Sequence, residues 1–178
     1  MVINCNLSKN CLFKINIKEQ DLKKKIIIGR KDKASLPDLG ITQVDIKLDT
    51  GAYTSAIHCH KIEKKLIDGK EVLTFTLLDP SHDQYLRKEF STEKFKIKQV
   101  KNSFGQSEKR YIIDTKILLF ETLHPIQLSL SERGKMRFPL LIGRRFIMGK
   151  FVVDPSKYDL SFKKKKSTIS IKSIKPKT

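Results

Sequence analysis

The sequence predicts an all-β protein, a closed β-barrel with one lobe per chain. Short segments rich in Ile, Val, Phe, Thr and Leu recur along the chain, and turn-forming residues separate them. Helical periodicity is nearly absent from the same region. At 178 residues the chain is long enough for one domain with a sizeable core and too short for two duplicated lobes of ordinary size.

The expected strands follow one another through the middle of the chain. Residues 44–48 alternate apolar and polar side chains, which predicts a strand with one buried face that ends at Asp49. Residues 138–143 are a continuous apolar run ending in glycine, as expected of a strand buried on both faces. Turn formers around Gly105 predict a hairpin tip, so that residues 101–110 could serve as a lid. The expected strands cover residues 26–28, 44–48, 55–58, 72–78, 94–100, 110–119, 126–130, 140–142, 151–153 and 160–162.

The composition divides the chain into three regions. Residues 1–25 have little consistent periodicity and are interpreted as an N-terminal extension. Residues 26–162 contain the expected strands and form the predicted folded domain. Residues 163–178 are rich in lysine, serine, isoleucine and threonine, which indicates a basic C-terminal tail.

Charge and cysteine usage limit the partners and the compartment. Lys and Arg number 37 against 19 Asp and Glu, and the net charge of +18 favours acidic partners such as nucleic acid, an anionic membrane or an acidic peptide. Lysine that merely coats a solvated surface would give the same excess. The odd, widely spaced set Cys5, Cys11 and Cys59 indicates no disulfide framework and favours a reducing compartment. With no apolar segment of signal or membrane-spanning length, a cytoplasmic protein without a membrane partner is expected.

The run from Asp49 to Ala52 has the residues that carboxylate-based hydrolysis needs. Such hydrolysis uses two carboxylates about 3 Å apart that share one proton, one activating a water and the other protonating the carbonyl oxygen. Asp49 supplies an acid at a strand end, and Thr50 a hydroxyl that can bond locally or across a symmetry axis. Gly51 lets the backbone approach the carboxylate closely. Since these residues are also common in ordinary β-turns, the tripeptide alone does not decide the matter.

The second acid of such a dyad must come from elsewhere. The remaining candidates, Asp45, Asp114, Asp154 and Asp159, do not lie in another Asp-Thr-Gly or Asp-Ser-Gly. A second copy of the chain is therefore the simpler source, which predicts a homodimer with its two-fold axis between the Asp49 side chains.

The segments Leu48–Ala52 and Leu141–Arg144, in this order, resemble the paired motifs of retropepsins, the homodimeric viral aspartic proteases. The chain is more similar still to a bacterial family commonly labelled ATP-dependent zinc protease or RimK-associated peptidase, whose pattern is retropepsin-like. The segments that carry this similarity are Ile28–Arg30, Leu36–Gly40, Lys47–Ala56, Val100–Gly105, Ser129–Arg133 and Phe138–Arg144.

The resemblance implies an aspartic endopeptidase-like hydrolase in which Asp49 is catalytic and Thr50 and Gly51 shape its loop. It also implies an ATP-grasp glutamate ligase as a partner. The reaction that it implies is the removal of glutamate residues from the tail of a ribosomal protein. An acidic peptide is compatible with the positive charge of the chain. The expected substrate-binding residues are Ala52, Asn102, Ser103, Arg110, Arg133 and Arg144. Viral retropepsins pair the arginine of the second motif with an acid shortly after the alanine, which this chain lacks, so Arg144 is expected to bind a substrate carboxylate or a different acid.

A zinc-dependent peptidase is the first alternative. Catalytic zinc takes three protein ligands and leaves one position for water. His58 and His60 could share one face of a strand, with His82 or His124 completing the set. Because the chain has no H-E-x-x-H motif, neither a metal nor another cofactor is expected, and zinc remains the minority interpretation.

The second alternative is a non-enzymatic basic β-barrel that binds RNA or the ribosome. Lysines would contact phosphates, while Phe95, Phe104 and Tyr111 would offer stacking surfaces. The chain contains no tryptophan and no recognisable nucleic-acid-binding motif, and aromatic residues at strand spacing more often belong to a core.

Overall fold

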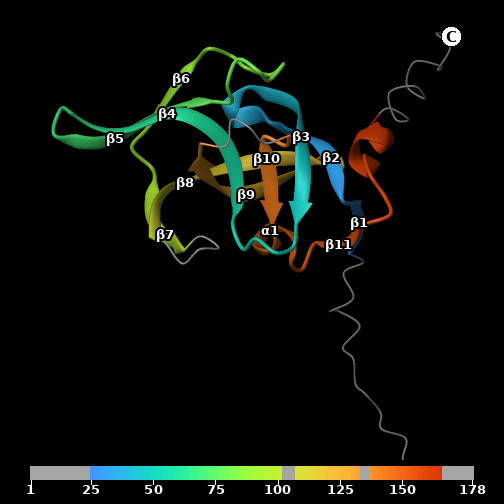
Figure 1. Ribbon diagram of the computed structural model, residues 1–178. Coiled ribbons are helices and arrows are strands. Elements are labelled where there is room, and N and C mark those ends of the chain that lie inside the picture. Colours follow the sequence, from blue (N-terminus) through green and yellow to red (C-terminus); the bar gives the residue numbers. More distant parts are fainter. Residues whose placement is uncertain (1–24, 102–106, 133–136, 166–178) are drawn as a thin grey trace, which may run out of the picture.

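The computed structural model describes residues 25–101, 107–132 and 137–165, and within these ranges β-strands dominate (Figure 1). The elements are β1 (Ile26–Gly29), β2 (Lys31–Leu36), the 3-10 turn η2 (Pro37–Leu39), β3 (Ile41–Asp49), β4 (Ser55–Ile67), β5 (Lys70–Leu77), β6 (Glu89–Thr92), β7 (Lys96–Lys101), β8 (Ser107–Leu119), β9 (Thr122–Ser131), β10 (Leu140–Gly143), α1 (Arg144–Ile147) and β11 (Phe151–Asp154). The all-β prediction is confirmed.

The strands close into an irregular ring in the order β10, β3, β2, β8, β9, β4 and back to β10. β10 lies parallel to β3 on one side and antiparallel to β4 on the other, which explains its continuous apolar sequence. The ring is weakest between β2 and β8, which are joined by the single pair Ser35 and Leu118. β5 and β6 extend the sheet beyond β4, and β1 and β11 form a separate parallel pair.

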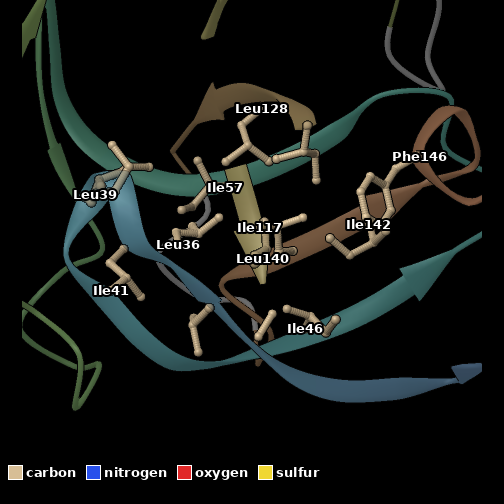
Figure 2. Packing of buried hydrophobic residues seen from close by; sticks show 14 of the residues in the cluster. Leu36, Leu39, Ile41, Ile46, Ile57, Ile117, Leu128, Leu140, Ile142 and Phe146 are labelled. Atoms are coloured by element: carbon tan, nitrogen blue, oxygen red, sulfur yellow. The ribbon is translucent and has the colours of Figure 1, made fainter. Parts of the chain in front are cut away.

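Aliphatic side chains from every strand of the ring fill its interior (Figure 2). β3 shows how the sequence pattern produces this core, because Val44, Ile46 and Leu48 are buried while Asp45 and Lys47 between them are exposed. Each fully buried aliphatic side chain contributes about 1.5–3 kcal/mol relative to an exposed one. The core therefore fixes where β3 ends, and with it the position of Asp49.

Nine of the ten expected strands correspond to observed strands, several of which extend further, and β2 and β6 were not expected. The strand expected at residues 160–162 is wrong, because residues 160–165 are helical. The buried carboxylate of Asp32 accepts hydrogen bonds from the backbone N–H groups of Ser161 (2.8 Å) and Phe162 (3.1 Å). These bonds satisfy donors that a helix start leaves without intrahelical partners, and they attach the helix to β2.

β7 and β8 pair antiparallel from Lys96 with Ile112 to Lys101 with Ser107, which is the expected hairpin. Its tip at residues 102–106 lies outside the described residues, so the lid remains a prediction. No helix in the described ranges is both long enough and apolar enough to cross a membrane.

Candidate active site

Asp49 is the last residue of β3 and lies beside Gly143, the last residue of β10. The parallel pairing sets Ile142 opposite Leu48 and Gly143 opposite Asp49. Leu48 is buried, whereas Asp49 is only partly buried. The chain then leaves the sheet in a loop of residues 50–54 and returns as β4 (Figure 1). The core thus presents a carboxylate at the edge of the ring.

One oxygen of the Asp49 carboxylate is fixed by its own loop. Oδ1 accepts hydrogen bonds from the backbone N–H groups of Gly51 (3.1 Å) and Ala52 (3.2 Å). A Cβ atom on residue 51 would lie 3.3 Å from this oxygen, so glycine permits the close turn. No hydrogen bond within the described residues engages Oδ2, which leaves this oxygen for a water, a substrate or a second carboxylate.

The end of β10 and the start of α1 hold the loop from behind. The Gly143 N–H donates to the buried Ser55 Oγ at 3.0 Å. A Cβ at position 143 would lie 2.6 Å from the Thr54 backbone carbon, which requires glycine there. The Arg144 N–H donates to the carbonyl of Ala52 (2.8 Å), and the Arg145 N–H to that of Tyr53 (3.1 Å). The second motif therefore determines the conformation of the Asp49 loop.

The side chain of Arg144 also contacts this loop. Its Nη1 donates to the Gly51 carbonyl at 3.0 Å, and its guanidinium carbon lies 5.6 Å from the centre of the Tyr53 ring. In place of the acidic partner that viral retropepsins would provide, the chain offers a carbonyl and an aromatic face. Because the side chain is exposed, its remaining donors face solvent beside Asp49.

Of the other expected substrate-binding residues, Ala52 and Arg110 lie within the described residues. Ala52 forms the turn with Asp49. Arg110 lies on β8, where its Nε and Nη2 donate to Glu108 Oε2 at 3.1 and 2.9 Å. Asn102, Ser103 and Arg133 lie outside the described residues.

The histidines named in the zinc alternative have separate partners. His60 Nδ1 lies 2.5 Å from the Leu78 carbonyl oxygen, and its ring packs against Tyr85. His124 packs against Phe146 and Phe151, and burial lowers its pKa. The structure therefore does not support the alternative in which His58 and His60 act together as zinc ligands, because the bulged pairing of β4 with β5 directs His60 to a backbone carbonyl.

His58 instead meets Asp79 and His82, a cluster that the sequence interpretation missed. His58 Nε2 lies 2.9 Å from Asp79 Oδ2, and His82 Nδ1 lies 3.0 Å from Asp79 Oδ1. The Ser81 hydroxyl, which also donates to Asp79 Oδ1, is the main reason why the pKa of this carboxyl lies well below its usual range. The turn-forming run from Asp79 to His82, following the β5 segment, is the signal that could have revealed this cluster.

The aromatic residues of the RNA-binding alternative are packed rather than presented. Phe95 and Tyr111 are partly buried against the core and meet edge to face, with ring centres 5.8 Å apart. Phe104 lies outside the described residues. Phe95 and Tyr111 thus do not offer the open stacking surface that this alternative assigned to them.

A ring of strands with Asp-Thr-Gly at a strand end, held from behind by an apolar strand ending in Gly-Arg, is consistent with a retropepsin-like fold. Residues 27–164 match the RimB-like family, described as retropepsin-like aspartic endopeptidase RimB, and the chain belongs to this family.

Relatives with similar sequences carry a different name. The chain is 35% identical over 137 residues to a probable alpha-L-glutamate ligase of Desulfotalea psychrophila and 31% identical over 132 residues to one of Parasynechococcus marenigrum. These matches cover 77% and 74% of this chain but only 29% and 28% of the relatives, so the chain spans less than a third of their length. The fold is also similar to the crystal structure of a Legionella pneumophila protein of unknown function, with a TM-score of 0.57 and 28% identity, over 76% of this chain and 98% of the other.

Proposed function

We propose that this protein is an aspartic peptidase whose catalytic dyad consists of two Asp49 side chains, one from each subunit of a homodimer. The observation that carries the proposal is the loop itself. Two backbone N–H groups donate hydrogen bonds to Asp49 Oδ1, while Oδ2 accepts no hydrogen bond from the described residues. One such carboxylate cannot act as both acid and base at the same moment, so the proposal requires a second copy.

The reaction follows from two carboxylates that share one proton. The ionised Asp49 takes a proton from a water, whose oxygen attacks the peptide carbonyl carbon, while the protonated Asp49 gives its proton to the carbonyl oxygen. The tetrahedral gem-diol then returns one hydroxyl proton to the ionised Asp49 as the C–N bond breaks, and the other Asp49 gives its proton to the leaving nitrogen, so that the dyad again holds one proton. Both acid and base come from the protein, so this mechanism needs no cofactor.

The surface around the loop supports an association of two copies. Tyr53, Met148 and Val152 are apolar or aromatic yet 50%, 57% and 48% exposed, respectively. They belong to the loop, the end of α1 and β11, which lie at the same end of the molecule (Figure 1). Thr50 is exposed there as well, with its hydroxyl able to bond across a two-fold axis. An interface at this end would place the two Asp49 side chains together.

Charge and relatives together support an acidic substrate. A cavity of about 380 Å³ adjoins the far end of the loop, where Thr54 and Ser55 line it together with the cationic Arg145 and Lys150. Asp114 and Gln127 also line this cavity, and Arg145 bonds to the latter. The net charge of +18 would attract polyglutamate. We extend the proposal to glutamate-rich tails of a ribosomal protein, cleaved in the cytoplasm beside an ATP-grasp glutamate ligase, because the relatives are named as glutamate ligases.

The test compares the wild type with Asp49→Asn on a glutamate-tailed peptide and on an unselective peptide library, with products followed by mass spectrometry. The wild type is expected to cleave the glutamate-tailed peptide, and Asp49→Asn to lose at least roughly 1000-fold in rate because the dyad is removed. Asp45→Asn, which changes an exposed acid on the same strand, serves as the matched control and should retain activity. Equal cleavage by wild type and Asp49→Asn would contradict the mechanism, while cleavage of library peptides alone would contradict only the substrate.

A further inference from the structure

Two imidazoles converge on one carboxylate away from Asp49. His58 comes from β4, whereas Asp79 and His82 come from the segment that follows β5. One ligand atom from each of the three residues lies within 4.8 Å of the other two. The exposed fractions of the side chains are 3% for His58, 20% for Asp79 and 12% for His82, so the cluster is largely shielded but can be reached from solvent on one side.

This set has the chemistry that zinc prefers. Two imidazole nitrogens and one carboxylate oxygen are common protein ligands of Zn²⁺, which leave a fourth position for water. Zinc–ligand distances of about 2.0–2.1 Å place neighbouring tetrahedral ligand atoms roughly 3.3 Å apart. The contacts at 2.9 and 3.0 Å are near this spacing but reach different oxygens of Asp79. One ligand atom from each residue lies within 4.8 Å of the other two, so rotation of the side chains would bring them around one ion.

We propose that His58, Asp79 and His82 bind one Zn²⁺ ion that fastens residues 79–82 to β4. Backbone bonds already bring these parts together, since the Leu78 N–H donates to the His58 carbonyl at 3.0 Å. His58 N–H in turn donates to the Pro139 carbonyl at 2.7 Å, directly before β10. The ion would therefore stabilise the junction of β4, β5 and β10. This proposal does not depend on the peptidase mechanism, because His58 lies three residues beyond Ser55, about 10 Å along β4 from the end of the Asp49 loop.

The experiment measures metal on the purified full-length protein. After incubation with zinc sulfate and exhaustive dialysis, we expect one zinc per chain in the wild type by mass spectrometry of the metal. His82→Gln should bind zinc at least roughly 100-fold more weakly by calorimetric titration, a loss that even an outer partner of a metal ligand can cause. His60→Gln is the matched control, because this imidazole lies two residues further along the same strand and faces the Leu78 carbonyl instead.

Two further readouts keep the test independent of any single variant. Zinc should raise the melting temperature of the wild type and of His60→Gln but not that of His82→Gln. Co²⁺ bound to the wild type should show the visible absorption of a tetrahedral site, which would decide the matter even if His82→Gln failed to fold. Absence of stoichiometric zinc in the wild type, zinc retained by a folded His82→Gln, or zinc lost from His60→Gln would each overturn the proposal. The pairs at 2.9 and 3.0 Å would then be hydrogen bonds alone.

Discussion

Gly51 lies in the loop that follows Asp49 and Gly143 packs against it, and an added methyl group would meet different neighbours at the two positions. At Gly143 it would lie 2.6 Å from the Thr54 backbone carbon, and at Gly51 it would lie 3.3 Å from Asp49 Oδ1. The sequence could predict Asp49 and its two motifs, because local turn chemistry and apolar runs are visible in one dimension. It could not predict that Arg144 contacts the Gly51 carbonyl, since that bond joins the start of α1 to the loop after β3, 93 residues earlier in the chain.

The two glycines are therefore expected to fail in different ways when replaced by alanine. Gly143→Ala should lower the free energy of unfolding by at least about 3 kcal/mol, because a backbone atom cannot move aside as a side chain can. Gly51→Ala should change stability by less than about 1 kcal/mol but reduce cleavage of the glutamate-tailed peptide by roughly 100-fold through displacement of the carboxylate. Urea unfolding and peptide cleavage measure the two effects. A stable Gly143→Ala protein, or a fully active Gly51→Ala protein, would contradict the described packing of the loop.

At the scale of elements, the strands could be predicted where apolar residues alternate, and the errors fall where tertiary contacts determine the structure. Residues 160–162 are apolar enough for a strand, yet Asp32 receives two of their N–H groups and the segment becomes helical. β2 was missed because one of its three buried positions is occupied by Asp32, a charged residue that the sequence alone would place on the surface. The cluster of His58 and Asp79 likewise depends on the hairpin of β4 and β5, whose register could not be predicted without recognising the turn between Ile67 and Lys70.

The turn after β5 leads to a prediction about pH. Asp79 has a pKa below its unfolded value, mainly through the Ser81 hydroxyl, so its hydrogen bonds stabilise the protein above the unfolded pKa of about 3.9. This stabilisation is lost as the pH falls through that value towards the lower folded pKa. With a chelator present, the melting temperature of the wild type should fall more than that of Ser81→Ala when the pH is lowered from about 6 to about 3. These values lie roughly two units above and one unit below the unfolded pKa of the Asp79 carboxyl. Ser91→Ala, an exposed change on β6, should follow the wild type. Parallel curves for wild type and Ser81→Ala would contradict the assigned cause.

At the scale of the whole molecule, the ring of strands is complete in one chain while the proposed dyad is not. The closing pair of β10 with β4 completes a hydrophobic core within the single chain. The sequence could predict this division, because it contains one Asp-Thr-Gly and is too short for two lobes. How two copies would pack could not be predicted from the apolar pattern, since only the fold brings the loop that carries Tyr53 to the same end of the molecule as α1 and β11, near which Met148 and Val152 lie in the sequence.

Mixing of active and inactive subunits tests this division directly. If each active site needs two Asp49 side chains, a mixed dimer of wild type and Asp49→Asn is inactive, so activity follows the square of the wild-type fraction. After co-refolding with an equal amount of Asp49→Asn, a fixed amount of wild type should cleave the glutamate-tailed peptide at about half its rate, since half of its subunits enter mixed dimers.

Co-refolding with a Thr50→Val, Asp49→Asn double variant should spare more of the activity, because the exposed Thr50 hydroxyl is expected to bond across the axis. The comparison variant Thr50→Ser, Asp49→Asn keeps that hydroxyl and should inhibit as strongly as Asp49→Asn alone. Activity that stays unchanged at every ratio of Asp49→Asn, while sedimentation shows that the subunits do mix, would mean that one chain holds a complete site.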